Sequence, residues 1–173
     1  MRMTAKKIAT MAVLTAVALI IFIVEAQINL PIVIPGVKLG LANAVTLFAL
    51  FYGRVKERMV DSLTTIDALM ILLCRILLGA IFTGRPIAFI YSLVGGLLAF
   101  VAQVLVRKIV THKQIWVCGA VGAVTHNIGQ IAAAAFVTGT PAIFAYLPVL
   151  IIAGVITGVI TGLIAQYTVE RLP

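Results

Sequence analysis

Apolar runs of about 20 residues recur along the whole chain, and each is long enough to cross a bilayer. With 63% hydrophobic and 10% charged residues, the composition excludes a soluble globular domain. A spanning segment must pair its backbone polar groups internally, which only helices and closed barrels achieve, and the regular ten-residue alternation of a barrel is missing from the sequence. We therefore expect an all-α membrane protein, a six-helix transmembrane bundle that forms one integral membrane domain over residues 1–173.

The second of the six expected spans is shorter than the others. We expect the spans at about 8–27, 39–53, 67–82, 86–106, 115–137 and 143–167. The second span is too short for a hydrocarbon core of roughly 30 Å. The preceding segment INLPIVIPGVKLG contains Pro31 and Pro35, so we expect it to re-enter the membrane or to cap the bundle as a lid.

Basic residues are distributed unevenly among the connections between spans. Most of them fall on one side of the expected topology, and only Lys38 and Arg85 lie opposite. The positive-inside rule therefore places both termini in the cytoplasm. The opening MRMTAKK resembles a secretory signal, but we expect it to begin the first membrane helix. We expect a multi-pass protein of the bacterial cytoplasmic membrane whose basic loops attract anionic lipid, with no nucleic-acid partner.

Arg75 lies near the middle of the apolar run ALMILLCRILLGAIF. An ionisable group at that depth costs several kcal/mol, so such residues usually face a protein interior, a hydrated cavity or a bound anion. We therefore expect Arg75 to be the anion partner of a binding site. The alternatives are that it extends to the headgroups or pairs with another helix.

Other polar residues concentrate in the expected outer halves of the spans, where an outward-opening pocket would suit a carboxylate or phosphate on an apolar body. We expect residues 29–40 to act as a gate. Tyrosines and basic residues there are also typical of the membrane interface, so each has an ordinary alternative role as a belt residue or headgroup anchor. The expected substrate-binding residues besides Arg75 are Lys38, Asn43, Asn127, Gln130, Glu25 and Tyr146.

Small residues recur at helical spacing on three spans. Gly122 shares a face with His126 and Gln130, and we expect His126 to bond between helices rather than to contact a ligand. A glycine stripe follows span six at Gly154, Gly158 and Gly162, which favours close helix packing. On span one, a smooth face that could dock a partner is formed by Ala5, Ala9, Ala12 and Ala16.

The sequence contains little that could support catalysis or metal binding. Only five residues are acidic, and Asp61 and Asp67 do not form an aspartate cluster for magnesium. We expect Asp67 to begin a helix rather than to couple transport. Cys74 and Cys118 lie on different spans without metal-ligand spacing. We therefore predict no catalytic residue, no metal and no cofactor.

Several motifs in succession resemble one family. They are PGVKLGLAN at 35–43, DALMILLCRILLGAIFTG at 67–84, YSLVGGLLA at 91–99, GAVGAVTHNIGQ at 119–130, and the segment from 139 to 165. Together they resemble the Gx transporter family, whose members are often labelled heptaprenyl diphosphate synthase component I. Its architecture is similar to that of S components of energy-coupling factor transporters. That resemblance implies that Ala5 with Ala9, or Ala12 with Ala16, docks a transmembrane coupling subunit driven by ATPases.

We therefore expect a substrate-binding subunit for uptake of a small amphipathic or anionic solute, such as a vitamin, quinone or isoprenoid precursor. The leading alternative is a non-catalytic membrane subunit of a heptaprenyl diphosphate synthase or quinone biosynthetic complex, with a soluble prenyl synthase as partner. A third possibility is a structural helical scaffold, in which the outer polar residues would serve packing or headgroup contact.

Overall fold

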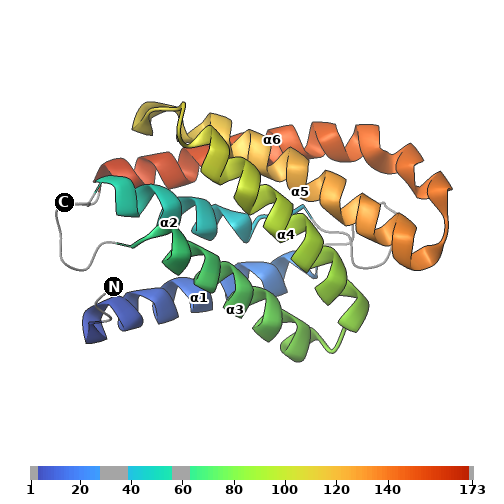
Figure 1. Ribbon diagram of the computed structural model, residues 1–173, viewed down its shortest axis with the longest axis horizontal. Coiled ribbons are helices and arrows are strands. Elements are labelled where there is room, and N and C mark those ends of the chain that lie inside the picture. Colours follow the sequence, from blue (N-terminus) through green and yellow to red (C-terminus); the bar gives the residue numbers. More distant parts are fainter. Residues whose placement is uncertain (1–3, 28–38, 56–62, 172–173) are drawn as a thin grey trace.

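The computed structural model describes residues 4–27, 39–55 and 63–171, and in them all regular structure is helical. Six α-helices lie side by side in a bundle (Figure 1). Two 3-10 turns, His112–Gln114 and Pro141–Tyr146, precede the last two helices. The α-helices are α1 (Ala5–Glu25), α2 (Asn43–Val55), α3 (Thr65–Thr83), α4 (Pro86–Val106), α5 (Ile115–Thr138) and α6 (Leu147–Arg171).

Five of these helices are long and apolar enough to cross a membrane; α2 is too short. Large apolar side chains such as Ile20, Ile81 and Phe82 are at least 60% exposed on their outer faces. Contact between so large an apolar surface and water would be strongly disfavoured, whereas lipid tails cover such a surface without cost. The chain is therefore a multi-pass membrane protein, while the count of six spans stays a prediction.

Turn residues define the helix ends. Thr64 caps α3, and Asp67 completes a capping box with it. Asp67 thus lies in the first turn of a helix, as the sequence predicts. Gly84 ends α3 with φ of +62°, a left-handed conformation that glycine adopts without steric cost. Pro86 then occupies the first turn of α4, where its missing N–H leaves no bond unmade.

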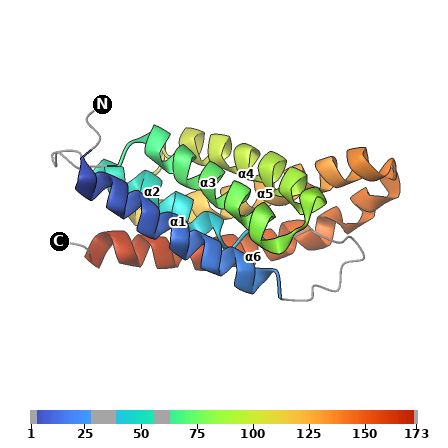
Figure 2. The same ribbon diagram turned by 90° about the horizontal axis from the view of Figure 1, so that it is seen from below.

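α1 begins and α6 ends at the same end of the bundle, which we call the terminal end (Figures 1 and 2). The opposite end is called the far end. α2 begins in the interior of the bundle and runs towards the terminal end. The start of α1 and the end of α6 thus share one end of the bundle, and the cytoplasmic orientation of that end stays a prediction.

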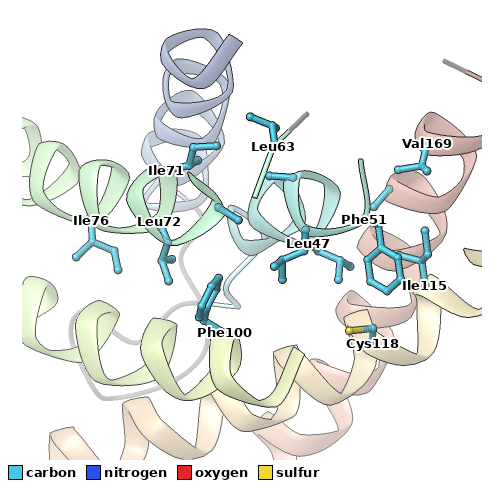
Figure 3. Close-up of a cluster of buried hydrophobic side chains, with 14 residues drawn as sticks. Leu47, Phe51, Leu63, Ile71, Leu72, Ile76, Phe100, Ile115, Cys118 and Val169 are labelled. Carbon is cyan, nitrogen blue, oxygen red and sulfur yellow. The ribbon is translucent and has the colours of Figure 1, made fainter. Parts of the chain in front are cut away.

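The short helix α2 is the centre of the bundle, since it contacts each of the other five helices. Leu47, Leu50 and Phe51 are at most 1% exposed. They pack against side chains from α3, α4, α5 and α6 (Figure 3). The other residues of this core that Figure 3 labels are Leu63, Ile71, Leu72, Ile76, Phe100, Ile115, Cys118 and Val169.

α5 packs most extensively of all, against α4 on one side and α6 on the other. Its contact with α6 is glycine-lined. A Cβ added at Gly158 would lie 2.6 Å from the Gly119 carbonyl oxygen and 2.7 Å from the Ala120 Cα. Real Cβ contacts are essentially never that short. The glycine stripe of α6 thus serves packing within the chain, because no side chain fits between the two backbones.

Candidate functional site

The guanidinium of Arg75 faces the interior of the bundle, where α1, α2 and α3 meet. Arg75 lies near the middle of α3 and is only 2% exposed. Its Nη2 donates a hydrogen bond of 2.8 Å to Oδ1 of Asn43, in the first turn of α2. The charged group also lies over the ring of Phe22 in α1, 5.6 Å from the ring centroid, which is within the range of a cation–π contact. Arg75 therefore does not extend to the headgroups.

Arg75 and Asn43 leave further hydrogen-bond donors beside this contact. A guanidinium only donates, so the Asn43 atom that faces it is the carbonyl oxygen, and the amide nitrogen is a second donor. Neither Asn43 Nδ2 nor Arg75 Nε has a hydrogen-bond partner among the residues that the structure describes. Burying a donor without a partner costs about 1–3 kcal/mol. One such donor on the buried cation and another beside it favour an anionic or strongly polar acceptor at this place.

Glu25, the last residue of α1, supplies the acidic group of the site. Its Oε1 accepts a hydrogen bond of 2.6 Å from the Gly40 N–H, and its Oε2 accepts one of 3.0 Å from the Leu41 N–H. Glu25 is 4% exposed and interacts electrostatically with Arg75. The carboxylate thus ties the end of α1 to the residues that lead into α2, and its charge offsets that of the guanidinium.

α5 closes the site with His126. Gly40 has φ of +78°, and a Cβ there would lie 2.7 Å from Cδ2 of His126 and 3.0 Å from Asn43 Nδ2. Only glycine is compatible with that approach. Nε2 of Gln130 lies 2.9 Å from Nε2 of His126. Because an amide nitrogen only donates, the ring nitrogen is the acceptor of this bond. The imidazole is therefore oriented by its own helix while it packs on the residues before α2.

Two of the expected site residues lie apart from this cluster. Asn127 donates a hydrogen bond of 2.7 Å from its Nδ2 to the carbonyl oxygen of Leu150, so it joins α5 to α6. Tyr146 ends the second 3-10 turn and packs half-buried in a separate apolar cluster with Tyr91 and Ile131. Of the expected set, the structure brings together Arg75, Asn43, Glu25 and Gln130. Lys38 and most of the expected gate, 29–38, lie outside the described residues.

The four alanines expected to dock a partner, Ala5, Ala9, Ala12 and Ala16, are all exposed on α1. They lie on the face of the helix turned away from the buried Ala18, Phe22 and Glu25. No other helix that the structure describes covers them.

A buried ion pair near the terminal end is a feature that the sequence does not predict. Nζ of Lys7 lies 2.7 Å from Oδ2 of Asp67, and the two side chains are 3% and 0% exposed. The pair joins α1 to α3. In the sequence, Lys7 is one of several basic residues of a flanking segment, and only its helical position relative to Ala18 and Glu25, on the inner face, could distinguish it.

Metal ligands do not gather in the described part of the chain. No group of three or more His, Cys, Asp or Glu side chains there could hold a metal ion. The thiols of Cys74, which is exposed, and Cys118, which is buried, are both free. The side chains that form the site are the cation of Arg75, the carboxylate of Glu25, the amides of Asn43 and Gln130, and the imidazole of His126.

The comparison with known families identifies the chain at the family level. A family model described as heptaprenyl diphosphate synthase component I matches residues 14–168, which is nearly the whole chain. No curated protein and no solved structure is significantly similar to it, so the likeness to S components of energy-coupling factor transporters stays a prediction. The matched range includes all residues of the Arg75 cluster, which are Glu25, Gly40, Asn43, Arg75, His126 and Gln130. The chain belongs to the heptaprenyl diphosphate synthase component I family.

Proposed function

We propose that the chain is a membrane-embedded binding subunit for a small amphipathic solute with an anionic head. The observation that carries this proposal is a pair of buried donors, Nε of the Arg75 guanidinium and Nδ2 of Asn43, that have no hydrogen-bond partner among the described residues. A phosphate or carboxylate oxygen would satisfy both donors and gain the charge interaction. Gln130 and His126 line the neighbouring wall from α5. The family description supports a prenyl diphosphate among the candidate solutes.

Uptake is the role that we assign to this binding. In our proposal the terminal end faces the cytoplasm of a bacterium, and the solute enters from the far end past residues 29–40, with Lys38 and Tyr146 contributing on the way. The chain has no nucleotide-binding motif, so a partner must supply the energy. The exposed face of Ala5, Ala9, Ala12 and Ala16 is a smooth surface on which a coupling transmembrane subunit, driven by ATPases, would dock.

Thermal-shift and binding measurements on the full chain in lipid nanodiscs test the site. We expect inorganic diphosphate and farnesyl diphosphate to stabilise the protein and neutral farnesol to stabilise it much less. Arg75→Ala should abolish the response to diphosphate, whereas Arg85→Ala, at an exposed arginine outside the cluster, should not. If Arg75→Ala does not fold, Arg75→Lys preserves the charge and removes the planar pair of donors. An unchanged diphosphate response in every Arg75 variant would refute the proposed site.

The family description favours a second candidate, a non-catalytic membrane subunit of a prenyl diphosphate synthase. In that role the same site would hold a prenyl diphosphate for a soluble partner. Affinity purification from native membranes separates the two candidates. Co-purified ATPases with a coupling protein support uptake, and a co-purified prenyl synthase supports the second role. If the chain docks a coupling subunit, Ala12→Trp on the exposed face of α1 should weaken capture of that subunit without altering diphosphate binding.

A further inference from the structure

An apolar groove of about 320 Å³ lies between α1, α2 and α6. Each helix contributes three residues, and the lining is apolar apart from Thr168. α2 forms the floor with Ala44 and Phe48, and the outer walls include Val17 of α1 and Ile164 of α6. Val17 is 42% exposed and Ile164 59%, so the groove opens sideways, where lipid surrounds the bundle.

One end of the groove lies beside the Arg75 cluster. Ala44, which lines the groove, directly follows Asn43, and Ile21, which also lines it, directly precedes Phe22. From there the lining follows α1 to Leu14, towards the terminal end. A hydrocarbon chain whose head lay at this end of the groove would place that head at the beginning of α2, where the donors of Asn43 and Arg75 lie.

The size of the groove distinguishes between a hydrocarbon chain and a helix. Leu14 and Ile21 are two turns apart, about 10 Å along α1. Spread over that length, the volume corresponds to a cross-section of roughly 30 Å², whereas a helix about 10 Å across needs roughly 80 Å². A single hydrocarbon chain fits inside this cross-section, whereas a partner helix could only lie over the open side of the groove. The exposed alanines of α1 lie on another face of that helix, so partner docking does not require the groove.

We propose that this groove holds the linear hydrocarbon tail of the anionic amphiphile whose head binds at Arg75. This inference rests on the proposed function and specifies its substrate class as a single-chain amphiphile. In the bound state the tail lies between α1 and α6, where the groove is open to lipid, and the head reaches the guanidinium around the first turn of α2. A compact solute such as a small vitamin would use the head site alone.

A tryptophan in the groove tests the inference. Val17→Trp places an indole at the wall, and Val13→Trp is the matched control, because Val13 is 62% exposed on α1 and does not line the groove. Each buried methylene contributes about fourfold to affinity. We therefore expect Val17→Trp in nanodiscs to weaken farnesyl diphosphate binding at least tenfold and to leave inorganic diphosphate within twofold of wild type. Val13→Trp should change neither ligand.

Other results would overturn the inference in distinguishable ways. Farnesyl diphosphate affinity could be equal in Val17→Trp and Val13→Trp while Arg75→Ala still does not respond to diphosphate. That result would show that the tail does not lie in the groove and would leave the proposed head site standing. The groove does not hold the solute's tail if the only effect of Val17→Trp is to reduce the amount of co-purified phospholipid. The same conclusion follows if its only effect is to reduce binding of a partner protein. If wild type binds no inorganic diphosphate and Arg75→Ala changes nothing, the proposed function itself fails. A farnesyl diphosphate analogue with a benzophenone at its tail should photolabel α1, α2 or α6, and labelling confined to other helices contradicts the proposal.

Discussion

Asn43 and Arg75 are joined by a hydrogen bond of 2.8 Å in the interior of the bundle, although 32 positions separate them in the sequence. The bond connects the first turn of α2 to the middle of α3 and holds a full positive charge at the centre of a hydrophobic protein. Removing its acceptor leaves the guanidinium with one more buried donor that lacks a partner.

Asn43→Ala should therefore destabilise the protein by about 2 kcal/mol, since hydrogen bonds to charged groups contribute roughly 1.5–3 kcal/mol. Asn43→Asp keeps an acceptor and adds a charge opposite the guanidinium, so it should recover most of the loss. Unfolding by SDS titration in mixed micelles measures both variants. A loss as large in Asn43→Asp as in Asn43→Ala would show that the contact contributes little.

Helix ends are local features, and the sequence predicts those of α3, α4 and α5 within two residues, whereas α6 begins and ends four residues later than expected. The sequence predicts the third and fourth spans at 67–82 and 86–106, close to the observed α3 and α4. Thr64, Gly84 and Pro86 act within one turn of their own positions, so no knowledge of neighbouring helices is needed. The prediction that the second span begins near Leu39 differs from the observed start of α2 at Asn43, because Gly40 adopts a left-handed φ and its N–H bonds to Glu25.

The direction in which a polar side chain points cannot be predicted in the same way. Asn127 and Gln130 are three residues apart and share a helical face, which predicts that both line one pocket. In the structure Asn127 bonds to α6, whereas Gln130 packs against Gly95 of α4. α5 is apolar almost all round and lies between two helices, so its sequence has no polar face from which to infer the neighbours.

The buried pair of Lys7 and Asp67 should respond strongly to the loss of either partner. Lys7→Met leaves the buried Asp67 carboxylate without its counter-ion, and breaking a buried pair in this way costs about 3–5 kcal/mol. Lys6→Met, at an exposed neighbour, is the control and should be nearly neutral. In the double variant Lys7→Met with Asp67→Asn the charge imbalance is gone, so most of the stability should return. A double-mutant cycle from SDS unfolding measures the coupling, and additive losses would contradict the pairing.

The α5–α6 interface should be intolerant of a single methyl group. In Gly158→Ala the new Cβ would approach the backbone of Gly119 and Ala120 at 2.6–2.7 Å, so the helices must separate. We expect a loss of about 1–3 kcal/mol and a lower Tm, as in other overpacked cores. Val155→Leu, at a 43% exposed position on the same helix, should leave the Tm nearly unchanged. Equal Tm values for Gly158→Ala and wild type would mean that the helices are not in close contact there.

Glu25→Gln should change stability and ligand binding in opposite directions. The amide has only one oxygen for the two N–H groups of Gly40 and Leu41, so the end of α1 is held less firmly and the protein unfolds more easily. The negative charge that now interacts with Arg75 is also removed, and an anionic ligand no longer competes with it. Removing this competing charge should raise diphosphate affinity several-fold, because like charges repel strongly where the effective dielectric constant is well below that of water. Parallel SDS unfolding and diphosphate titration in nanodiscs separate the two effects. A variant that is less stable and also binds diphosphate more weakly would show that Glu25 supports the ligand rather than opposing it.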